Sequence, residues 1–293
     1  MEALFATDGA HPARTAESLV TSLFGRDVGI HAYTVSSDPR RDWLVPVEDL
    51  EHARMDVPVI GGDQVASEGA DRLGAKGFEP SFASNRGAPG PEIVREAEAQ
   101  GVGVIVLGAS HHTWMGNLLL GSVSTYVLHH ASCSVLVAHR PPLGSGTVLF
   151  GTDGSEQASS ALSLATKLLD SSRCSFQVAS AVVDPLAHVA VYPPRAFLGN
   201  TREYGELEKR RMDNTWDVVN QACGRLQALG FKADGTVLSG SPTHQLLKES
   251  DNVSADLVVV GARGRGPVSR GLFGSVSDQL VRHAPATLVG HST

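Results

Sequence analysis

Glycines and arginines gather in one stretch near the end of the chain. The glycines precede a serine in the spacing Gly-x2-Gly-x9-Gly-Ser: Gly261, Gly264, Gly274 and Ser275. Three arginines lie in the same stretch: Arg263, Arg265 and Arg270. Glycine permits φ > 0 and lets a ligand approach main-chain N–H groups closely, and a helix start offers unpaired N–H groups to an anion. Because the stretch combines these groups with positive charge, it predicts a phosphate-binding loop.

Two elements must hold this loop in place. The apolar residues 258–260 run into Gly261 and predict a buried strand, and an amphipathic segment beginning at Gly274 predicts a helix. A second polar turn, Asp153-Gly154-Ser155, closes an earlier apolar run, and Ser155 is a favoured N-cap for the next helix. Ligands of parallel sheets lie beyond the carboxyl ends of strands, so we expect the two turns to flank one site.

The chain contains an internal repeat. A shift of 153 residues superimposes one stretch on another without a gap: Gly87 on Gly240, Pro89 on Pro242, Gly108 on Gly261, Gly121 on Gly274 and His130 on His283. Asp8-Gly9 maps onto Asp153-Gly154 with a shift of 145. Since solenoid repeats are only roughly 20 to 50 residues long, this period predicts two similar domains, 1–140 and 147–293, joined near residues 141–146.

The loop spacing and its Asp-Gly-Ser partner resemble the universal stress protein family, in its ATP-binding branch. The resemblance implies that Asp153 contacts the nucleoside, that the backbone around Val182 contacts the adenine edge, and that the glycine loop and the following helix start line the ribose and phosphates. Arg263 and Arg265 join this set because a phosphate favours positive charge. The expected binding residues are therefore Asp153, Val182, Gly261, Arg263, Gly264, Arg265, Gly274, Ser275 and Val276. The expected ligand is ATP, with Mg²⁺ arriving with the nucleotide.

Strands alternate with helices in both copies, which predicts an α/β fold with right-handed crossovers. We expect two doubly wound five-stranded parallel sheets, with strand order 3-2-1-4-5 and helices on both faces. The strands expected in the second copy are 148–151, 176–183, 231–238, 256–260 and 287–290. A long helix over 201–229 has an apolar stripe that we expect to be core: Met212, Trp216, Val219, Cys223 and Leu226. Residues 36–62 are expected to be irregular apart from a short helix.

The first copy departs from the pattern at the loop. His111 stands where the second glycine belongs, and the arginine positions become Ser110, His112 and Asn117. The first domain therefore loses three full charges, and we expect it to bind ATP weakly or not at all. Its weaker candidate residues are Asp8, Gly108, His111, Gly121, Ser122 and Val123. An alternative is that His111 and His112 become charged below about pH 6.5 and create a pH-dependent anion site.

Composition excludes several classes of protein. The net charge is −7, with 24 basic and 31 acidic residues, so we expect no nucleic-acid partner. Three cysteines without a CxxC pair favour a reducing cytosol and core packing: Cys133, Cys174 and Cys223. No run approaches the roughly 20 apolar residues of a membrane helix, and the start lacks a basic segment, so we expect a cytoplasmic protein without a membrane partner.

Enzyme motifs are not apparent either. The chain lacks the lysine of a Walker A motif, and its glycines are spaced wrongly for a dinucleotide fingerprint. The histidines lack HExxH or Cys-His spacing, so we expect no dedicated metal site. Asp153 and Asp278 are the carboxylates near the loop, and phosphoryl transfer needs a placed base and a metal clamp. We therefore expect at most a slow ATPase.

Two functional hypotheses follow. The first is an ATP-dependent stress-response and signalling module with an unidentified protein partner; a homodimer remains open. The second is a scaffold in which the two domains form an intrachain pseudo-dimer. The resemblance implies pairing of the last strands, 134–138 against 287–291, and such edge strands carry unpaired backbone groups. A bulky residue at Gly261 is expected to abolish nucleotide binding without disturbing the fold.

Overall fold

A computed structural model of the chain describes residues 1–36, 61–109, 112–114, 117–183, 201–264 and 274–291. For residues 112–114, 117–119 and 201–204 it describes the backbone alone. The irregular segment expected at 36–62 lies almost entirely outside the described residues, as do Arg265, Arg270, Ser110 and His111.

Strands and helices alternate in each half. The first half contains β1 (Glu2–Ala6), α1 (His11–Leu23), β2 (Gly29–Ser36), α4 (Gly62–Gly74), β3 (Pro80–Arg86), α5 (Pro89–Gln100), β4 (Val104–Gly108), β5 (His112–Trp114), β6 (Asn117–Leu119), α6 (Ser122–His130) and β7 (Ser134–Ala138). The second contains β8 (Thr147–Gly151), α7 (Glu156–Leu168), β9 (Ser175–Val182), α8 (Thr201–Ala228), β10 (Lys232–Ser239), α9 (Pro242–Asn252), β11 (Leu257–Gly261), α10 (Ser275–His283) and β12 (Ala286–Gly290).

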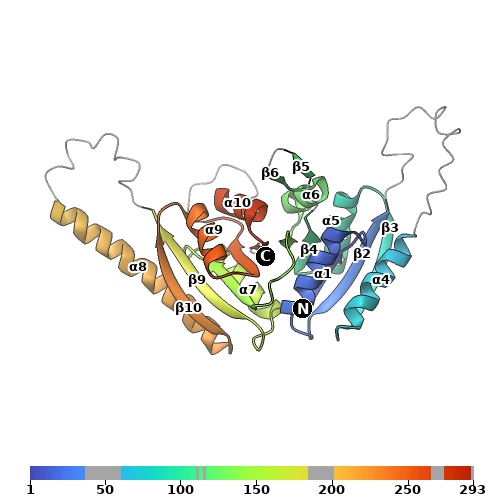
Figure 1. The fold of residues 1–293 in the computed structure, drawn as a ribbon, viewed down its shortest axis with the longest axis horizontal. Helices are drawn as coiled ribbons and strands as arrows, with labels where there is room; N and C mark the ends of the chain where they lie inside the picture. Colours follow the sequence, from blue (N-terminus) through green and yellow to red (C-terminus); the bar gives the residue numbers. More distant parts are fainter. Residues whose placement is uncertain (37–60, 110–111, 115–116, 184–200, 265–273, 292–293) are drawn as a thin grey trace.

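The main strands form one sheet (Figure 1). It has ten strands in the order β10-β9-β8-β11-β12-β7-β4-β1-β2-β3. Each half keeps the expected order 3-2-1-4-5, but the two expected five-stranded sheets form one continuous sheet, because the last strands pair as the resemblance implied. The last strands, β7 and β12, pair antiparallel, for example Leu136 with Leu288. Each would otherwise expose a row of unpaired N–H and C=O groups, and pairing satisfies both rows. The short antiparallel hairpin β5–β6 was also not expected.

Helices cover both faces of this sheet, as predicted. Helices α1, α4, α7 and α8 contribute to a hydrophobic cluster on one face that continues across both halves, with Phe24 and Leu169 at the junction. On the other face, α5 and α6 pack over the first half, and α9 packs over the second. Helix α10 contributes to both of these clusters through Val281 and Leu280. The halves therefore share a core as well as a sheet.

Helix α8 differs from the prediction. Val219 and Leu226 on its stripe are fully buried, but Trp216 is 39% exposed. The helix has 28 residues and packs on strands of 8 residues each. At rises of about 1.5 and 3.3 Å per residue, the helix is longer than the strands by roughly 15 Å. Figure 1 shows its N-terminal turns extending beyond the sheet, which explains why the apolar stripe is only partly core.

The connection between the halves is fixed by a buried carboxylate. Asp256 is 1% exposed and precedes β11. Its carboxylate accepts hydrogen bonds from the Leu143 amide at 2.5 Å, the Ser145 hydroxyl at 3.0 Å and the Gly146 amide at 2.8 Å. The Pro-Gly-rich segment predicted as a linker is thus anchored to the second half.

The cysteines lie in the core, as expected. Cys133, Cys174 and Cys223 are all buried. Burial raises the pKa of the Cys174 thiol to about 12 and that of Cys133 to about 11.

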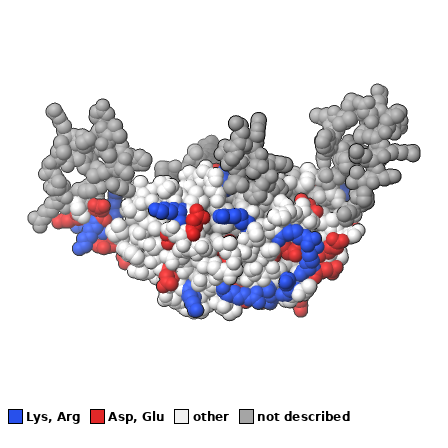
Figure 2. Space-filling view, viewed as in Figure 1, with Lys and Arg blue, Asp and Glu red and all other residues white. Residues whose placement is uncertain are grey.

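Among the described residues, no helix is long and apolar enough to cross a membrane. On the face drawn in Figure 2, acidic and basic side chains are interspersed, which is unlike the basic surface of nucleic-acid-binding proteins.

Candidate nucleotide site

A cavity of about 330 Å³ lies beyond the carboxyl ends of β8 and β11 in the second half. These strands are neighbours, with Gly151 beside Val260, and strand order reverses between them. The expectation that the two chemically loaded turns flank one site is confirmed, since both line this cavity. The lining residues are Gly151, Thr152, Asp153, Ala158, Ala179, Ala181, Pro242, Leu246, Val260, Gly261, Arg263, Gly264, Gly274, Ser275, Val276 and Ser277.

Local hydrogen bonds fix the Asp153 turn. The Gly154 amide donates to the Thr152 hydroxyl at 3.1 Å, and the Ser155 amide donates to Asp153 Oδ1 at 2.9 Å. Gly154 has φ +73°, a conformation that favours glycine. Ser155 caps α7 by accepting from the Ala158 amide at 3.2 Å, as predicted. The turn therefore holds the Asp153 carboxylate at the cavity wall.

The base of the arginine-containing loop is closed by hydrogen bonds. The Gly274 amide donates to the Ala262 carbonyl at 2.8 Å, and the buried Ser277 hydroxyl donates to the same carbonyl at 2.9 Å. Helix α10 begins directly after Gly274, so its first turn, Ser275 to Ser277, lines the cavity. Amides of a first helical turn have no partner within the helix, which makes this wall suited to an anion.

The glycines act by close packing rather than by φ > 0. None of Gly261, Gly264 and Gly274 adopts a left-handed backbone conformation. A Cβ on Gly261 would lie 2.8 Å from the Ala158 backbone nitrogen, so this glycine lets α7 pack against β11. We therefore expect a bulky residue there to disturb the packing of α7 as well as the cavity, in contrast to the expectation from the sequence. A Cβ on Gly264 would lie 2.7 Å from Asp153 Oδ2, which brings the two turns together.

Positive charge at the cavity comes from Arg263. Its side chain is exposed and lines the cavity. The pKa of the His291 imidazole is lowered mainly by burial and further by the charge of Arg263. His291 is therefore neutral at pH 7, and Arg263 is the one positively charged side chain among the described residues that line the cavity.

Other predicted residues lie elsewhere. Val182 ends β9 but does not line the cavity, and its carbonyl accepts from the Gly240 amide at 2.9 Å. Ala179 and Ala181 on the same strand line the cavity instead, and the sequence analysis missed them. Thr152 was missed too, although the repeated triplet Thr-Asp-Gly could have revealed it. In the described part of the chain, no group of three or more His, Cys, Asp or Glu side chains is arranged to hold a metal ion.

The first half contains an equivalent cavity of about 420 Å³. Its turn has the same geometry, since the Gly9 amide donates to the Thr7 hydroxyl at 3.1 Å and the Ala10 amide donates to Asp8 Oδ1 at 2.9 Å. The predicted residues Asp8, Gly108, Gly121, Ser122 and Val123 all line it. The lining residues are Ala6, Thr7, Asp8, Pro12, Ala13, Tyr33, Val35, Pro89, Ile93, Leu107, Gly108, Leu120, Gly121, Ser122, Val123 and Ser124.

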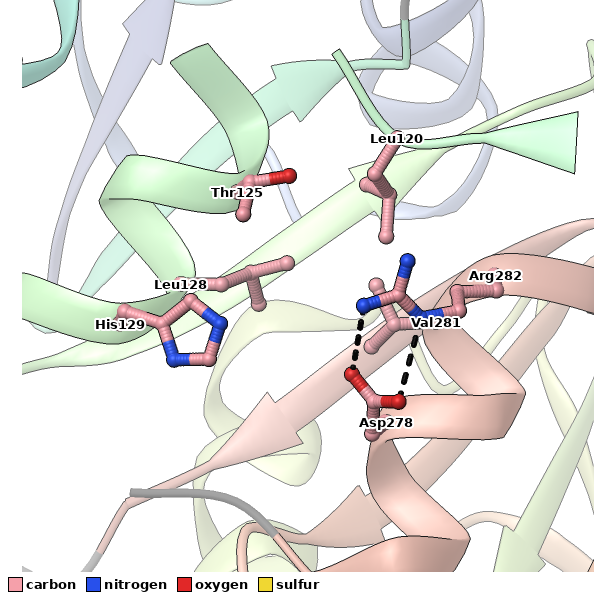
Figure 3. A pocket seen from close by; sticks show the side chains of 7 residues that line it. All are labelled: Leu120, Thr125, Leu128, His129, Asp278, Val281 and Arg282. Atoms are coloured by element: carbon pink, nitrogen blue, oxygen red, sulfur yellow. Dashed lines mark hydrogen bonds and ion pairs between the residues drawn. The ribbon is translucent and has the colours of Figure 1, made fainter. Parts of the chain in front are cut away.

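The first-half cavity adjoins a junction between the halves. Leu120, at the first-half cavity, and Leu128 of α6 face Val281 and Arg282 of α10 across a narrow cleft (Figure 3). Arg282 forms a bidentate ion pair with Asp278, at 3.1 and 3.0 Å. Asp278, one of the two carboxylates expected near the loop, is thus held by an arginine and does not line the second-half cavity.

A doubly wound α/β fold with a cavity at the point of strand-order reversal defines a class of ligand-binding proteins. A family model described as "Universal stress protein family" matches residues 2–139 and 145–289. The chain belongs to the universal stress protein family, in a tandem arrangement.

Relatives and solved structures agree with this assignment. The chain is 29% identical to universal stress protein Rv2005c of Mycobacterium tuberculosis over 203 residues, 68% of this chain and 63% of that protein. It is 31% identical to a universal stress protein of Mycolicibacterium smegmatis over 186 residues, 62% of this chain and 58% of that protein. The chain therefore spans less than two thirds of the length of these relatives.

A universal stress protein structure from Archaeoglobus fulgidus has a TM-score of 0.64 at 20% identity, covering 99% of this chain and 97% of that one. A functionally unknown protein from Pseudomonas aeruginosa has a TM-score of 0.59 at 17% identity, covering 98% and 91%. At these identities the structures show a shared fold.

Proposed function

We propose that the second half binds ATP and that the protein is a nucleotide-dependent stress-response and signalling module. The observation that carries the proposal is one cavity that combines a fixed carboxylate, a guanidinium and the first turn of α10. Phosphates require N–H donors and cations. The apolar wall formed by Ala179, Ala181 and Leu246 suits the faces of an adenine ring.

The residues take distinct roles in this proposal. The phosphates lie against Ser275 and Val276 at the start of α10, with Arg263 as counter-charge, and Mg²⁺ arrives with the nucleotide. Asp153 accepts hydrogen bonds from the ribose hydroxyls. The adenine lies along the end of β9, where a contact with the backbone of Val182 stays a prediction. Arg265 and Arg270, by sequence, add charge to the same loop.

Fast hydrolysis is not part of the proposal. Asp278 is engaged by Arg282 and does not line the cavity, and the proposal places Asp153 at the ribose rather than at the phosphates. A general base must be free to accept a proton from the attacking water. We therefore expect fewer than about one turnover per second, which is the low end of ordinary enzymes. Multiple-turnover ATPase above that rate would contradict the proposal.

A matched pair of variants tests nucleotide binding. Arg263→Ala should weaken ATP binding about tenfold, because a charge-assisted contact of about 1.4 kcal/mol is lost. Arg173→Ala, which removes an arginine away from the cavity, should leave ATP affinity unchanged. Isothermal titration calorimetry measures both. The expected stoichiometry is one ATP per chain, and two equal sites would contradict the predicted difference between the halves.

The second candidate function is a scaffold. The antiparallel pairing of β7 with β12 favours it, because it joins the two halves into one pseudo-dimeric sheet. The two candidates differ in whether adenine nucleotide co-purifies with the protein, measured by ultraviolet absorbance after acid precipitation. The sequence also leads us to expect a cytoplasmic location and an unidentified protein partner, and it leaves a homodimer open.

A further inference from the structure

The two cavities correspond position by position but differ in charge. Each contains the aspartate of a Thr-Asp-Gly turn and the first turn of a helix. Arg263 adds a guanidinium to the second-half cavity. Among the described residues that line the first-half cavity, Asp8 is the one fully charged side chain. By sequence, the counterpart of Arg263 is Ser110, which is neutral. A polyphosphate in the first half would therefore meet a carboxylate without the arginine that compensates it in the second.

The apolar walls differ as well. Tyr33 and Val35 on β2 occupy the positions of Ala179 and Ala181 on β9, as the pairing of Ala6 with Tyr33 and of Gly151 with Ala179 shows. Tyr33 is 2% exposed, and burial followed by the charge of Glu96 raises its pKa, so the phenol is neutral at pH 7. These larger side chains have not filled the cavity, which at about 420 Å³ is large enough for a small organic ligand.

We propose that the first-half cavity binds a neutral nucleoside and discriminates against its triphosphate. The aromatic base lies against the wall formed by Tyr33, Val35 and Ile93, and the ribose hydroxyls donate to Asp8. The Ala10 amide at 2.9 Å holds that carboxylate in place, and a carboxylate can accept several further hydrogen bonds. The nucleoside class rests on the ATP proposal for the second half, because the two cavities are equivalent. The preference for a neutral ligand rests on the charge of the first-half lining.

Blocking each cavity in the full chain tests this proposal. Val35 and Ala181 are equivalent, partly exposed residues at the cavity walls, so a tryptophan at either position should fill one cavity only. The probes are adenosine and ATP, measured by isothermal titration calorimetry. The Ala181→Trp chain should bind one adenosine, and it should bind ATP at least about tenfold more weakly than it binds adenosine. The Val35→Trp chain should lose that adenosine site and still bind one ATP.

The outcomes separate the two proposals. An Ala181→Trp chain that binds no adenosine, or binds ATP as tightly as adenosine, overturns the nucleoside proposal. A Val35→Trp chain that binds no ATP overturns the ATP proposal, and adenosine binding by the Ala181→Trp chain then decides the nucleoside proposal by itself. Circular dichroism and thermal unfolding check that both variants fold.

If a tryptophan variant does not fold, Asp8→Asn replaces it, because asparagine keeps the oxygen that accepts the Ala10 amide and removes the charge. With ATP saturating the second half, this variant should bind adenosine about tenfold more weakly than the wild type. Unchanged adenosine affinity overturns the nucleoside proposal.

Discussion

The turn after the first strand is built alike in both halves, but the walls around it are not. Gly9 and Gly154 have φ values of +74° and +73°, and the hydrogen bonds of the two turns agree in length. Around these turns, Tyr33 occupies the position in the first half that Ala179 occupies in the second. The first-half lining has no described counterpart of Arg263. The comparison shows that backbone packing fixes where a cavity forms, whereas a few side chains decide what it can bind.

The largest expected effect concerns a feature that the second half alone contains. Asp256 accepts hydrogen bonds from three donors in the segment that joins the halves. The residue that the internal repeat places at the same position in the first half is Gly103. Asp256→Ala should lower the free energy of unfolding by about 4 kcal/mol, because the buried Gly146 amide is left unpaired and the partly buried Leu143 and Ser145 donors lose a charged acceptor, and each such loss costs about 1 to 3 kcal/mol. Urea denaturation measures the change. Asp251→Ala removes a carboxylate that is 78% exposed and should change stability by less than about 0.5 kcal/mol.

The glycines that end the fourth strand of each half should differ in their tolerance of a methyl group. A Cβ on Gly108 would lie 2.0 Å from the Pro12 carbonyl oxygen, whereas one on Gly261 would lie 2.8 Å from the Ala158 nitrogen. We expect Gly108→Ala to destabilise by about 3 kcal/mol and Gly261→Ala by about 2 kcal/mol, because backbone atoms of the facing helix must move. Thermal unfolding ranks the two. The reverse order would mean that the helices do not pack as described.

The buried thiols should make the protein less stable in alkali. Burial raises the pKa of Cys174 from 9.0 to about 12 and that of Cys133 from 9.0 to about 11. Above pH 9 the unfolded chain ionises these thiols and the folded chain does not, so stability falls as pH rises toward the folded pKa. At pH 10 the loss should be about 1 kcal/mol for each thiol.

The measurement is the free energy of unfolding at pH 8 and pH 10. Cys174→Ala should reduce the difference between the two values, and an unchanged difference would contradict the burial of this thiol.

The smallest expected effect concerns the helix that follows each turn. Ser155 caps α7 with its side chain, whereas Ala10 occupies the N-cap of α1 without a side-chain hydrogen bond. Ser155→Ala should cost about 1 kcal/mol. Ala10→Ser should stabilise by about 0.5 kcal/mol, because Ala10 already has the extended backbone that a capping residue needs. A double variant as stable as the wild type would show that the two effects cancel and that the two turns are interchangeable.

Much of the fold could be predicted from the sequence because its signals are local. The alternation of apolar runs with amphipathic segments identified the five strands of the second half to within two residues at each end. The start of α7 followed from Ser155. The exposed Trp216 could not be predicted, because a periodic stripe does not show where the supporting strands end. The hairpin β5–β6 was missed because its strands are only three residues long.

The candidate site was predicted only in part. Residues that carry charge or shape the loop were identified, including Asp153, Arg263 and Gly274, because their chemistry is visible in their types and spacing. The apolar wall was missed, since alanines such as Ala179 and Ala181 look like any other strand residues. Their role follows from the neighbour that strand pairing gives them.

The order of residues by itself determined that the chain is a duplicated α/β protein, because spacing and periodicity are properties of one dimension. It also determined that the two loops differ in charge. Only the tertiary structure decided the antiparallel register in which the two last strands pair, that Gly261 serves helix packing, and that the first half keeps an open cavity. Each of these depends on which backbone atoms come into contact in three dimensions, and such contacts between distant residues cannot be read from the order of residues.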